Sequence, residues 1–509
     1  MLSSKALNNL TLKLIILIIS GVFYYNSAIY PQTKLKSSIS IGLESLYNFK
    51  FKTAEKIFNG LIKNYPDSPA GYHYRSLSYL WFYLDSKQDS DYDNFFAYTD
   101  TAIEKANQIL EKDTTDEFTL YLFGSVYANR TFAFTRDENY FDAIFSASKF
   151  YSYFSELLDL DSLYYDAFMG KGLYNFAISQ APQTWSWALN ISGMTGDKQA
   201  GLNYLKIASK KGQLSKIDAQ FYLSQIDAEF LLEYSEAKSI LDYLNSRFPD
   251  NLLFRYSRGN LYLKKFELNN ASREFKSVLN SKDTNFIQIK NYAGLALGDI
   301  SYSQGDFKTA RTYFTNFLEH SIDDHFKGIT ALKVGLSYLF EGDSISALLF
   351  FDKTSDGNND LDEDAFAKIK GKQYLNKLPV KAELKLISIK NMIDAGKFKL
   401  AIDSLEKFIK IPVSDTLRSE AILYLSQSYY YFGKFKKSLE YAIAVFNFDD
   451  CDLWVKPFAC YYAARASKDL KNYIDAKLFI DYANNFKDYI FENKLEDKLN
   501  FLSFHLREK

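Results

Sequence analysis

Four histidines are the first side chains to consider for chemistry in this 509-residue chain. Catalysis by imidazole needs a partner group within hydrogen-bond reach, and no histidine lies in a motif that supplies one. His320 and His325 are five residues apart, which does not place them on one helix face as a metal-binding pair requires, and we expect both on the surface. The chain also lacks a phosphate-binding glycine loop and a Gly-x-Ser-x-Gly motif. We therefore predict no catalytic residue, no metal site and no cofactor, in a protein that is not an enzyme.

Two other patterns are weak indications of chemistry. The run from Asp356 to Asp364 has alternating oxygen ligands, but Leu361 and Ala367 stand where a calcium loop needs glycine and glutamate. This departure favours a solvated loop that caps the next helix. Cys451 and Cys460 are nine residues apart, and they either form one disulfide in an exported chain or are two small hydrophobic residues in a helical pair.

The composition describes a well-packed chain without a charge bias. Hydrophobic residues make up 47% and aromatic residues 17%, which excludes a disordered protein. Only 8 prolines and 22 glycines are present, too few for an all-β protein with many tight turns. The 61 Lys and Arg against 62 Asp and Glu give no basic excess, so we predict no nucleic-acid partner.

The first 30 residues resemble a targeting segment. Lys5 and Lys13 precede an apolar run, and a basic start followed by about 7–15 apolar residues is typical of a secretory signal. This run has three interpretations: a cleaved signal peptide, an uncleaved N-terminal membrane anchor or a buried first helix. We expect an exported protein of the periplasm or cell envelope, with membrane association through residues 10–25 and possible anchoring to the inner membrane as one alternative.

An internal repeat predicts the elements that would position a binding surface. Apolar residues recur at helical spacing, and self-similarity at a period of about 34–40 residues indicates a helical solenoid. The frame is Gly-x-x-Tyr on one helix and Ala-x-x-x-Phe on the next, and its clearest copies contain Gly259, Tyr262 and Ala271, and then Gly335, Tyr338 and Ala347. The pattern resembles the tetratricopeptide repeat. We predict an all-α fold, an α-solenoid of stacked antiparallel helix pairs in a TPR-like superhelix.

Residues 85–215 depart from this frame, although Gly124-x-x-Tyr127 is still repeat-like. About 60–100 residues of this region resemble the eukaryotic tetratricopeptide-repeat-39 and inclusion-body-clearance family, whose pattern matches Gly170, Gly172, Pro182, Gly193, Gly196, Asp197, Gly201 and Leu202. Met194 stands where that family usually has phenylalanine. The resemblance implies a related helical core and a scaffold role near a membrane or lipid surface, and it transfers no catalytic activity. Read from the residues alone, Asp197 is a helix cap and Gly201 allows close contact between helices.

These patterns predict the domain organisation. Residues 1–30 form the signal peptide or anchor, 35–84 N-terminal TPR-like repeats, 85–215 a divergent helical region with insertions, 216–356 TPR repeats, and 357–509 C-terminal TPR repeats with a capping helix.

The surface of the repeats is the remaining source of function. The first helix of each tetratricopeptide pair lines the concave face, so we predict that a peptide or protein partner binds Tyr256, Asn260, Asp299, Tyr302, Gln427, Tyr430 and Tyr431. Alternatively, several of these tyrosines simply pack between repeats. We expect no groove of clustered Lys or Arg. The predicted function is a non-catalytic interaction scaffold of the cell envelope, and the alternative is a protein that handles a lipid or hydrophobic ligand through the aromatic region 138–202.

Overall fold

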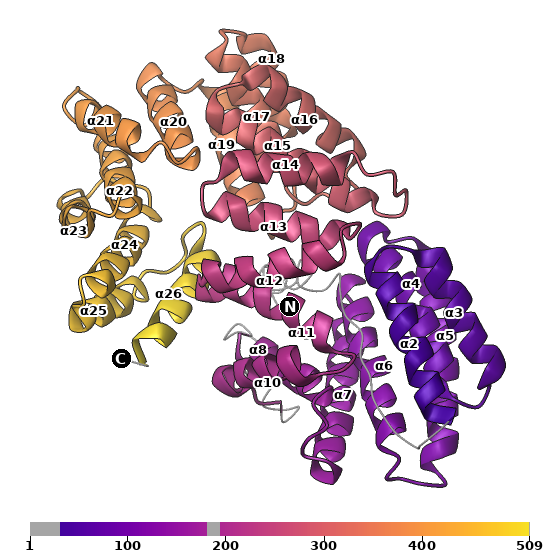
Figure 1. Ribbon diagram of the computed structural model, residues 1–509. Coiled ribbons are helices and arrows are strands. Elements are labelled where there is room, and N and C mark those ends of the chain that lie inside the picture. The colour runs from indigo at the N-terminus through magenta and orange to yellow at the C-terminus, as the bar shows by residue number, and fades with distance from the viewer. Residues whose placement is uncertain (1–30, 181–193, 508–509) are drawn as a thin grey trace. The chain divides into compact units, whose positions relative to one another are not determined.

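The computed structural model describes residues 31–180 and 194–507. Every regular element in this part of the chain is a helix, and no strand occurs in it. The prediction of an all-α solenoid of antiparallel helix pairs is confirmed (Figure 1). Among the described helices, none combines the length and the apolar character that a membrane crossing needs. The predicted targeting segment lies outside the described residues.

The chain divides into two compact units. Among the described residues, the N-terminal unit comprises residues 31–180, 194–261 and 280–290, and the C-terminal unit comprises residues 262–279 and 291–507. The helices of the N-terminal unit are α2 (Pro31–Tyr47), α3 (Phe51–Asn64), α4 (Pro69–Ser86), α5 (Asp89–Leu110), α6 (Glu117–Arg136), α7 (Tyr140–Leu160), α8 (Ala167–Ser179), α10 (Lys198–Lys211), α11 (Lys216–Ile226), the π-helical turn η2 (Asp227–Leu231) and α12 (Tyr234–Arg247).

Two helices, α13 (Leu252–Lys264) and α15 (Ile287–Gln304), contain residues of both units. The other helices of the C-terminal unit are α14 (Leu268–Leu279), α16 (Phe307–His320), α17 (Lys327–Phe340), α18 (Ser344–Asp352), η3 (Lys353–Asp356), α19 (Asp362–Asn376), α20 (Lys381–Asp394), α21 (Phe398–Phe408), α22 (Asp415–Tyr431), α23 (Phe435–Ala444), η4 (Val445–Asn447), α24 (Val455–Asp469), α25 (Tyr473–Ala483) and α26 (Glu492–Arg507).

A glycine on the first helix of a pair lets a phenylalanine of the second helix approach closely. At Gly335 of α17, an added Cβ atom would lie 2.5 Å from Cε1 of Phe351, so a larger side chain would force α17 and α18 apart. Gly298 and Phe314 repeat this arrangement in the preceding pair, again at 2.5 Å. Ala347 on α18 is completely buried. The spacing of glycine and phenylalanine therefore sets how tightly each helix pair packs.

The other small residues singled out in the repeat and in the 120–215 region also lie at close contacts. Gly124 and Gly170 face opposite edges of the Phe154 ring, where an added Cβ would lie 2.6 and 2.0 Å away. The Asp197 carboxylate accepts a hydrogen bond from the Ala200 amide at 3.0 Å and so caps α10. The remaining positions are Gly172 against Leu205, Gly196 against Ser179, the buried Tyr262 and Ala271, Tyr338 stacked on Phe350, and Gly259 within α13.

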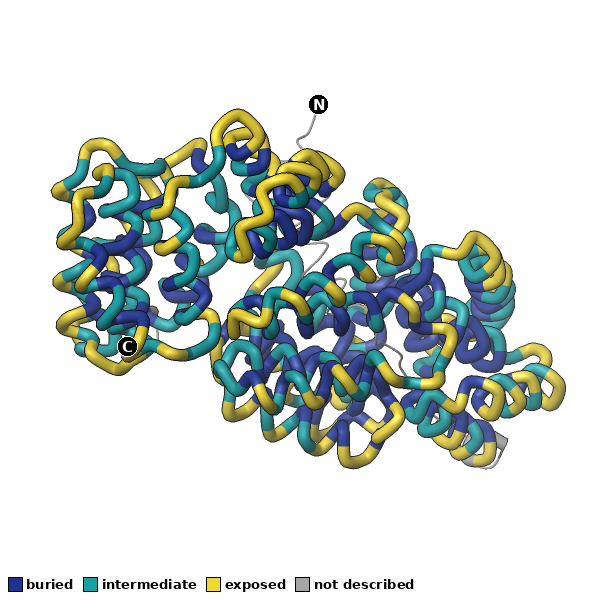
Figure 2. Tube along the Cα trace, turned by 90° about the horizontal axis from the view of Figure 1, so that it is seen from above, coloured by how far each residue is buried: buried dark blue, intermediate teal, exposed yellow. Residues whose placement is uncertain are grey.

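The inner helices of the N-terminal unit are buried on nearly all sides (Figure 2). The chain closes here on itself, because α2 contacts residues that follow about 170–200 positions later. The Tyr47 hydroxyl donates to the Asp218 carboxylate at 2.5 Å, and the Asn251 side chain donates to the Tyr47 carbonyl at 2.9 Å. At the surface, Arg247 pairs with Glu44 at 2.8 Å. The buried contacts of Tyr47 occupy the inner faces of α2 and α11, so these two faces are not available to a partner.

Buried aspartates hold the loops between helices. Oδ1 of Asp166 accepts hydrogen bonds from the amides of Gln213, Leu214 and Ser215 at 2.9–3.0 Å and from the Ser215 hydroxyl at 2.7 Å. Asp85 accepts from the amides of Gln288 and Ile289, both at 2.9 Å. These carboxylates satisfy amides that have no partner within a helix.

The acidic run 356–364 forms a structured loop. The Asp364 carboxylate accepts hydrogen bonds from the amides of Phe326, Ile329 and Asn358. Asp364 is 1% exposed, so the end of the run ties its loop to the start of α17. Within the described residues, no group of three or more His, Cys, Asp or Glu is placed to hold a metal ion.

The histidines differ from the sequence-based expectation at one position. His320 is exposed, as expected. The expectation that His325 lies on the surface is wrong, because it is 9% exposed and its Nδ1 lies 3.2 Å from an Asp323 carboxylate oxygen. The tight turn before α17 draws it inward. His73 on α4 is completely buried, and burial lowers its pKa to about 3.

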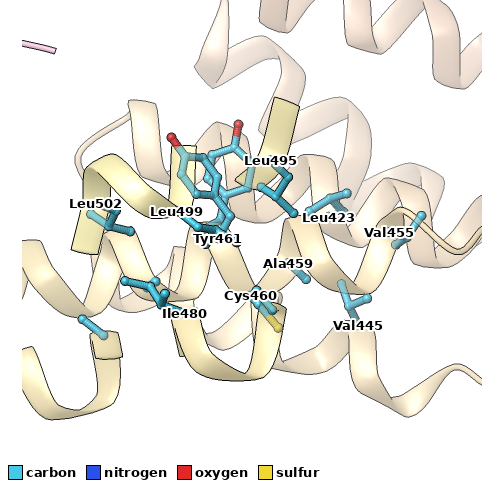
Figure 3. Packing of buried hydrophobic residues seen from close by; sticks show 14 of the residues in the cluster. Leu423, Val445, Val455, Ala459, Cys460, Tyr461, Ile480, Leu495, Leu499 and Leu502 are labelled. Atoms are coloured by element: carbon cyan, nitrogen blue, oxygen red, sulfur yellow. The ribbon is translucent and has the colours of Figure 1, made fainter. Parts of the chain in front are cut away.

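The last helix covers one end of the C-terminal unit. Leu495, Leu499 and Leu502 of α26 lie in one cluster with Cys460 of α24 and Ile480 of α25 (Figure 3). Cys460 is completely buried there and its thiol is free, as is the thiol of Cys451 in the preceding loop.

Candidate binding chamber

The inner helices of the C-terminal unit surround a chamber of about 420 Å³. Side chains from α15, α17, α19, α20, α22, α24 and α26 line it, together with Phe491 just before α26. Its size lies in the range of pockets that bind small molecules or peptide side chains. We call this space the chamber.

Two contacts between α19 and the start of α26 close one side of the chamber. The rings of Phe366 and Phe491 lie 5.5 Å apart, centroid to centroid. Lys494 forms an ion pair with Glu363. Because α26 is anchored on α24 and α25 by its leucines, these contacts fix the position of the chamber wall.

Aromatic side chains are the largest group in the chamber wall, eight of its 22 lining residues. They are Tyr302, Phe366, Tyr374, Tyr424, Trp454, Phe458, Tyr462 and Phe491. Phe366, Trp454 and Phe458 are half-buried, and each contacts another ring of the wall. Large half-exposed rings provide apolar area at a low cost in conformational entropy, which suits them to anchor a ligand.

Five lysines also line the chamber, against two glutamates, Glu383 and Glu420. The lysines are Lys333, Lys370, Lys390, Lys494 and Lys498. The expectation of no clustered Lys or Arg is therefore wrong for this unit. The cluster is hard to see in the sequence because its members come from four different helices separated by up to 165 residues.

Carboxylates inside and beside the chamber hold these ammonium groups in place. Nζ of Lys333 lies 2.6 Å from the Asp299 carboxylate, and Nζ of Lys390 lies 2.5 Å from the Asp394 carboxylate. Lys370 lies 3.6 Å from Glu383. Since neither Asp299 nor Asp394 lines the chamber, the lining itself is more basic than acidic.

The two glutamates of the wall are bonded to tyrosines. The Tyr374 hydroxyl donates to Glu383 at 2.8 Å, and the Tyr424 hydroxyl donates to Glu420 at 2.6 Å. Burial raises the pKa of Glu420 above its ordinary value, and the hydrogen bond from Tyr424 opposes this shift. The chamber therefore offers ring faces together with lysines and glutamates that ion pairs and hydrogen bonds hold in place.

Three of the seven predicted partner-binding residues come together at the chamber. Tyr302 and Gln427 line it, and Asp299 holds the lysine at position 333. Tyr302 is only 6% exposed, so its ring is mainly part of the packed wall.

The other predicted residues lie elsewhere. The Tyr430 hydroxyl donates to Asp469 at 2.5 Å, and the Arg465 guanidinium lies 4.1 Å from the Tyr430 ring. Tyr431 stacks on Phe398 with centroids 5.4 Å apart, so both tyrosines pack between helices. Tyr256 and Asn260 of α13 belong to the N-terminal unit and do not line the chamber.

Sequence reasoning missed the residues of α19. Phe366, Lys370 and Tyr374 are four residues apart and share one face of this helix. The helix contains Gly371-x-x-Tyr374, a match to the Gly-x-x-Tyr half of the frame that the prediction did not use, so no position in it was assigned to the concave face. Their i, i+4, i+8 spacing is the signal that would have found them.

Comparison with known proteins agrees with the repeat geometry. The family model described as Iml2/Tetratricopeptide repeat protein 39 matches residues 166–325, about a third of the chain. This range includes the glycine and aspartate pattern from Gly170 to Leu202 and the pairing of Gly298 with Phe314. Over residues 166–325 the chain is therefore similar to tetratricopeptide-type repeat proteins. A search of curated proteins found no match.

The chain is also similar to solved structures of other proteins. Yeast Tom70 is 11% identical, with 93% of this chain and 96% of that chain covered and a TM-score of 0.29. The P58(IPK) TPR domain is 14% identical, covering 81% and 94%, with a TM-score of 0.21. A chain of the APC/C hetero-tetramer Cut9–Hcn1 is 13% identical, covering 91% and 95%, with a TM-score of 0.25.

Proposed function

We propose that this protein is a non-catalytic interaction scaffold and that its chamber binds a segment of a partner protein. The observation that carries the proposal is a space of about 420 Å³ among inner helices, lined in part by half-buried aromatic rings. Tetratricopeptide-type repeats gain their stability from contacts between neighbours, so an inner surface of this kind is free to serve binding.

The wall favours a segment with one or two large apolar side chains and acidic neighbours. Phe366, Trp454 and Phe458 provide faces for an apolar anchor. Four of the five lysines in the lining are paired with carboxylates, so they attract a carboxylate of the partner as hydrogen-bond donors rather than through a net positive charge. Because nearby carboxylates already hold several of these lysines, the apolar anchor contributes most of the affinity and charge selects the partner.

Substitution of the chamber wall is expected to reduce peptide binding. Peptides selected from a random display library on the full-length chain serve as probes, and their Kd is measured by fluorescence polarisation. We expect Phe458→Ala to weaken binding at least tenfold, because it removes a half-buried anchor face. Lys370→Ala should have a smaller effect that decreases as salt is raised.

Matched exposed positions on outer helices provide the controls. Leu478→Ala on α25, where the side chain is 60% exposed, and Lys399→Ala on α21, where it is 63% exposed, should leave binding unchanged. Equal affinity of the Phe458→Ala and Leu478→Ala variants would remove the chamber from the proposal.

Export to the cell envelope is a separate part of the proposal, supported by the basic start and the apolar run of residues 14–25. A C-terminal alkaline phosphatase fusion, which is active only outside the bacterial cytoplasm, is expected to show activity. Replacing Leu17 and Ile18 with aspartate should abolish this activity, because charge in the apolar run prevents insertion. Equal activity of both fusions would contradict export through this segment.

A further inference from the structure

The N-terminal unit contains a second cavity that differs from the chamber in size and polarity. It has a volume of about 140 Å³ and lies among α6, α7, α8 and α11. Its wall includes Ala128, Phe132, Phe150, Leu173 and Ile226, and no charged side chain lines it. The proposed peptide binding does not involve this cavity.

The hydroxyl groups of the two threonines in the wall are already bonded to the backbone. The Thr131 hydroxyl donates to the Tyr127 carbonyl at 2.9 Å, and the Thr135 hydroxyl donates to the Thr131 carbonyl at 2.7 Å. Both threonines line the cavity. Because their donor protons are used within α6, these residues offer little to an internal water molecule.

Rings form another part of the wall. Tyr174 stacks on Tyr151 with centroids 4.0 Å apart and meets the Phe150 ring edge-on at 5.7 Å. Tyr222 packs near Phe132 at 6.5 Å, and its buried hydroxyl is the polar atom of the wall that has no hydrogen-bond partner among the described residues. A water molecule needs two to four polar partners to remain in a cavity, and an apolar cavity of about 150 Å³ stays dry and binds benzene.

Small residues create the space. Ala128, Ala147 and Ala177 lie in the wall at positions where a larger aliphatic side chain would occupy the cavity. Leu173, Ala177 and Ile178 are partly exposed, so one side of the cavity reaches the surface of the unit. An empty apolar cavity of this size destabilises the folded state, so a molecule that fills it gains binding free energy from the restored contacts.

We propose that this cavity binds an uncharged hydrocarbon group of about six to eight carbons, supplied by an aromatic ring or by the end of an aliphatic chain. The wall accepts such a group by shape and apolar contact. A charged or strongly polar molecule would lose its hydration without finding partners there.

Binding of two probes to the full-length chain tests this proposal. Toluene represents the ring and 1-octanol represents the chain, and each is titrated by calorimetry and in thermal unfolding. At least one probe is expected to bind saturably and raise Tm, because a ligand that binds only the folded state stabilises it. The stronger of the two identifies the source of the hydrocarbon group. Failure of both to bind would overturn the proposal.

Variants that change the cavity volume connect binding to this site. Ala177→Leu fills the space from a partly exposed position, and we expect it to weaken binding of the probe at least tenfold. Ala97→Leu on the exposed face of α5 is the matched control and should bind as the unmodified chain does. Leu173→Ala enlarges the cavity and should shift preference from toluene towards naphthalene. Undiminished binding by Ala177→Leu, or an unchanged preference in Leu173→Ala, would place the probes elsewhere and contradict the proposal.

Discussion

Replacing Asp166 with alanine is expected to lower the free energy of unfolding by about 3–5 kcal/mol. The single oxygen Oδ1 accepts three backbone amides and one hydroxyl from residues 213–215, in a site that is 3% exposed. Each buried donor left without an acceptor costs about 1–3 kcal/mol. The variant also avoids the free-energy cost of burying a charged carboxylate, and this offsets part of the loss. The expected decrease is measured by urea unfolding at neutral pH.

The matched variant is Asp166→Asn, which keeps an oxygen at the same place and removes the charge. All four hydrogen bonds end on one oxygen, so the amide carbonyl of asparagine can accept them. We expect this variant to lie within about 1 kcal/mol of the unmodified chain, since the lost charge was itself disfavoured by burial. If both variants lost the same stability, the charge rather than the acceptor geometry would be the essential property.

The repeat frame could be predicted because it depends on side-chain volume at fixed spacing. Gly335 and Phe351 are 16 residues apart, and so are Gly298 and Phe314. In both pairs the ring lies where a Cβ atom of the glycine position would be. This relation is local, since one helix pair contains both residues. Side-chain size and residue spacing within one helix pair can therefore be predicted from a single sequence.

The chamber could not be predicted in the same way, because its wall depends on contacts between distant helices. Lys494 of α26 meets Glu363 of α19 across 131 positions, and Phe366 meets Phe491 at similar separation. Nothing in either segment alone indicates the other. Applying one frame to every repeat also assigned Tyr430 to a binding face, whereas it packs against Arg465 and Asp469.

The chain is expected to be more stable at pH 5 than at pH 7.5, by about 3–5 kcal/mol. Burial raises the pKa of Asp85, Asp166 and Asp364 from 3.8 to about 6, and that of Asp227 to about 7. As pH falls through these values, the folded state takes up protons that the unfolded state does not bind until near pH 4. Its stability therefore rises, by about 1–2 kcal/mol per group at pH 5. His73 acts in the opposite direction, since the unfolded chain protonates it near pH 6.5 and the folded chain only near pH 3. This loss amounts to about 2 kcal/mol at pH 5.

Urea unfolding at the two pH values measures the difference, and two variants separate its opposing contributions. His73→Phe removes the group that loses stability in acid, so the gain between pH 7.5 and pH 5 should increase by about 2 kcal/mol. Asp227→Asn removes a carboxyl whose pKa is raised, and it should reduce the gain in stability between pH 7.5 and pH 5 by a similar amount. Neither ring nitrogen of His73 has a hydrogen-bond partner among the described residues, so phenylalanine leaves no described donor or acceptor without its partner. The contrary result is a urea-unfolding midpoint that falls between pH 7.5 and pH 5 in both the unmodified chain and His73→Phe. The folded state would then bind fewer protons than the unfolded state, as it does when the buried carboxylates are stabilised as anions.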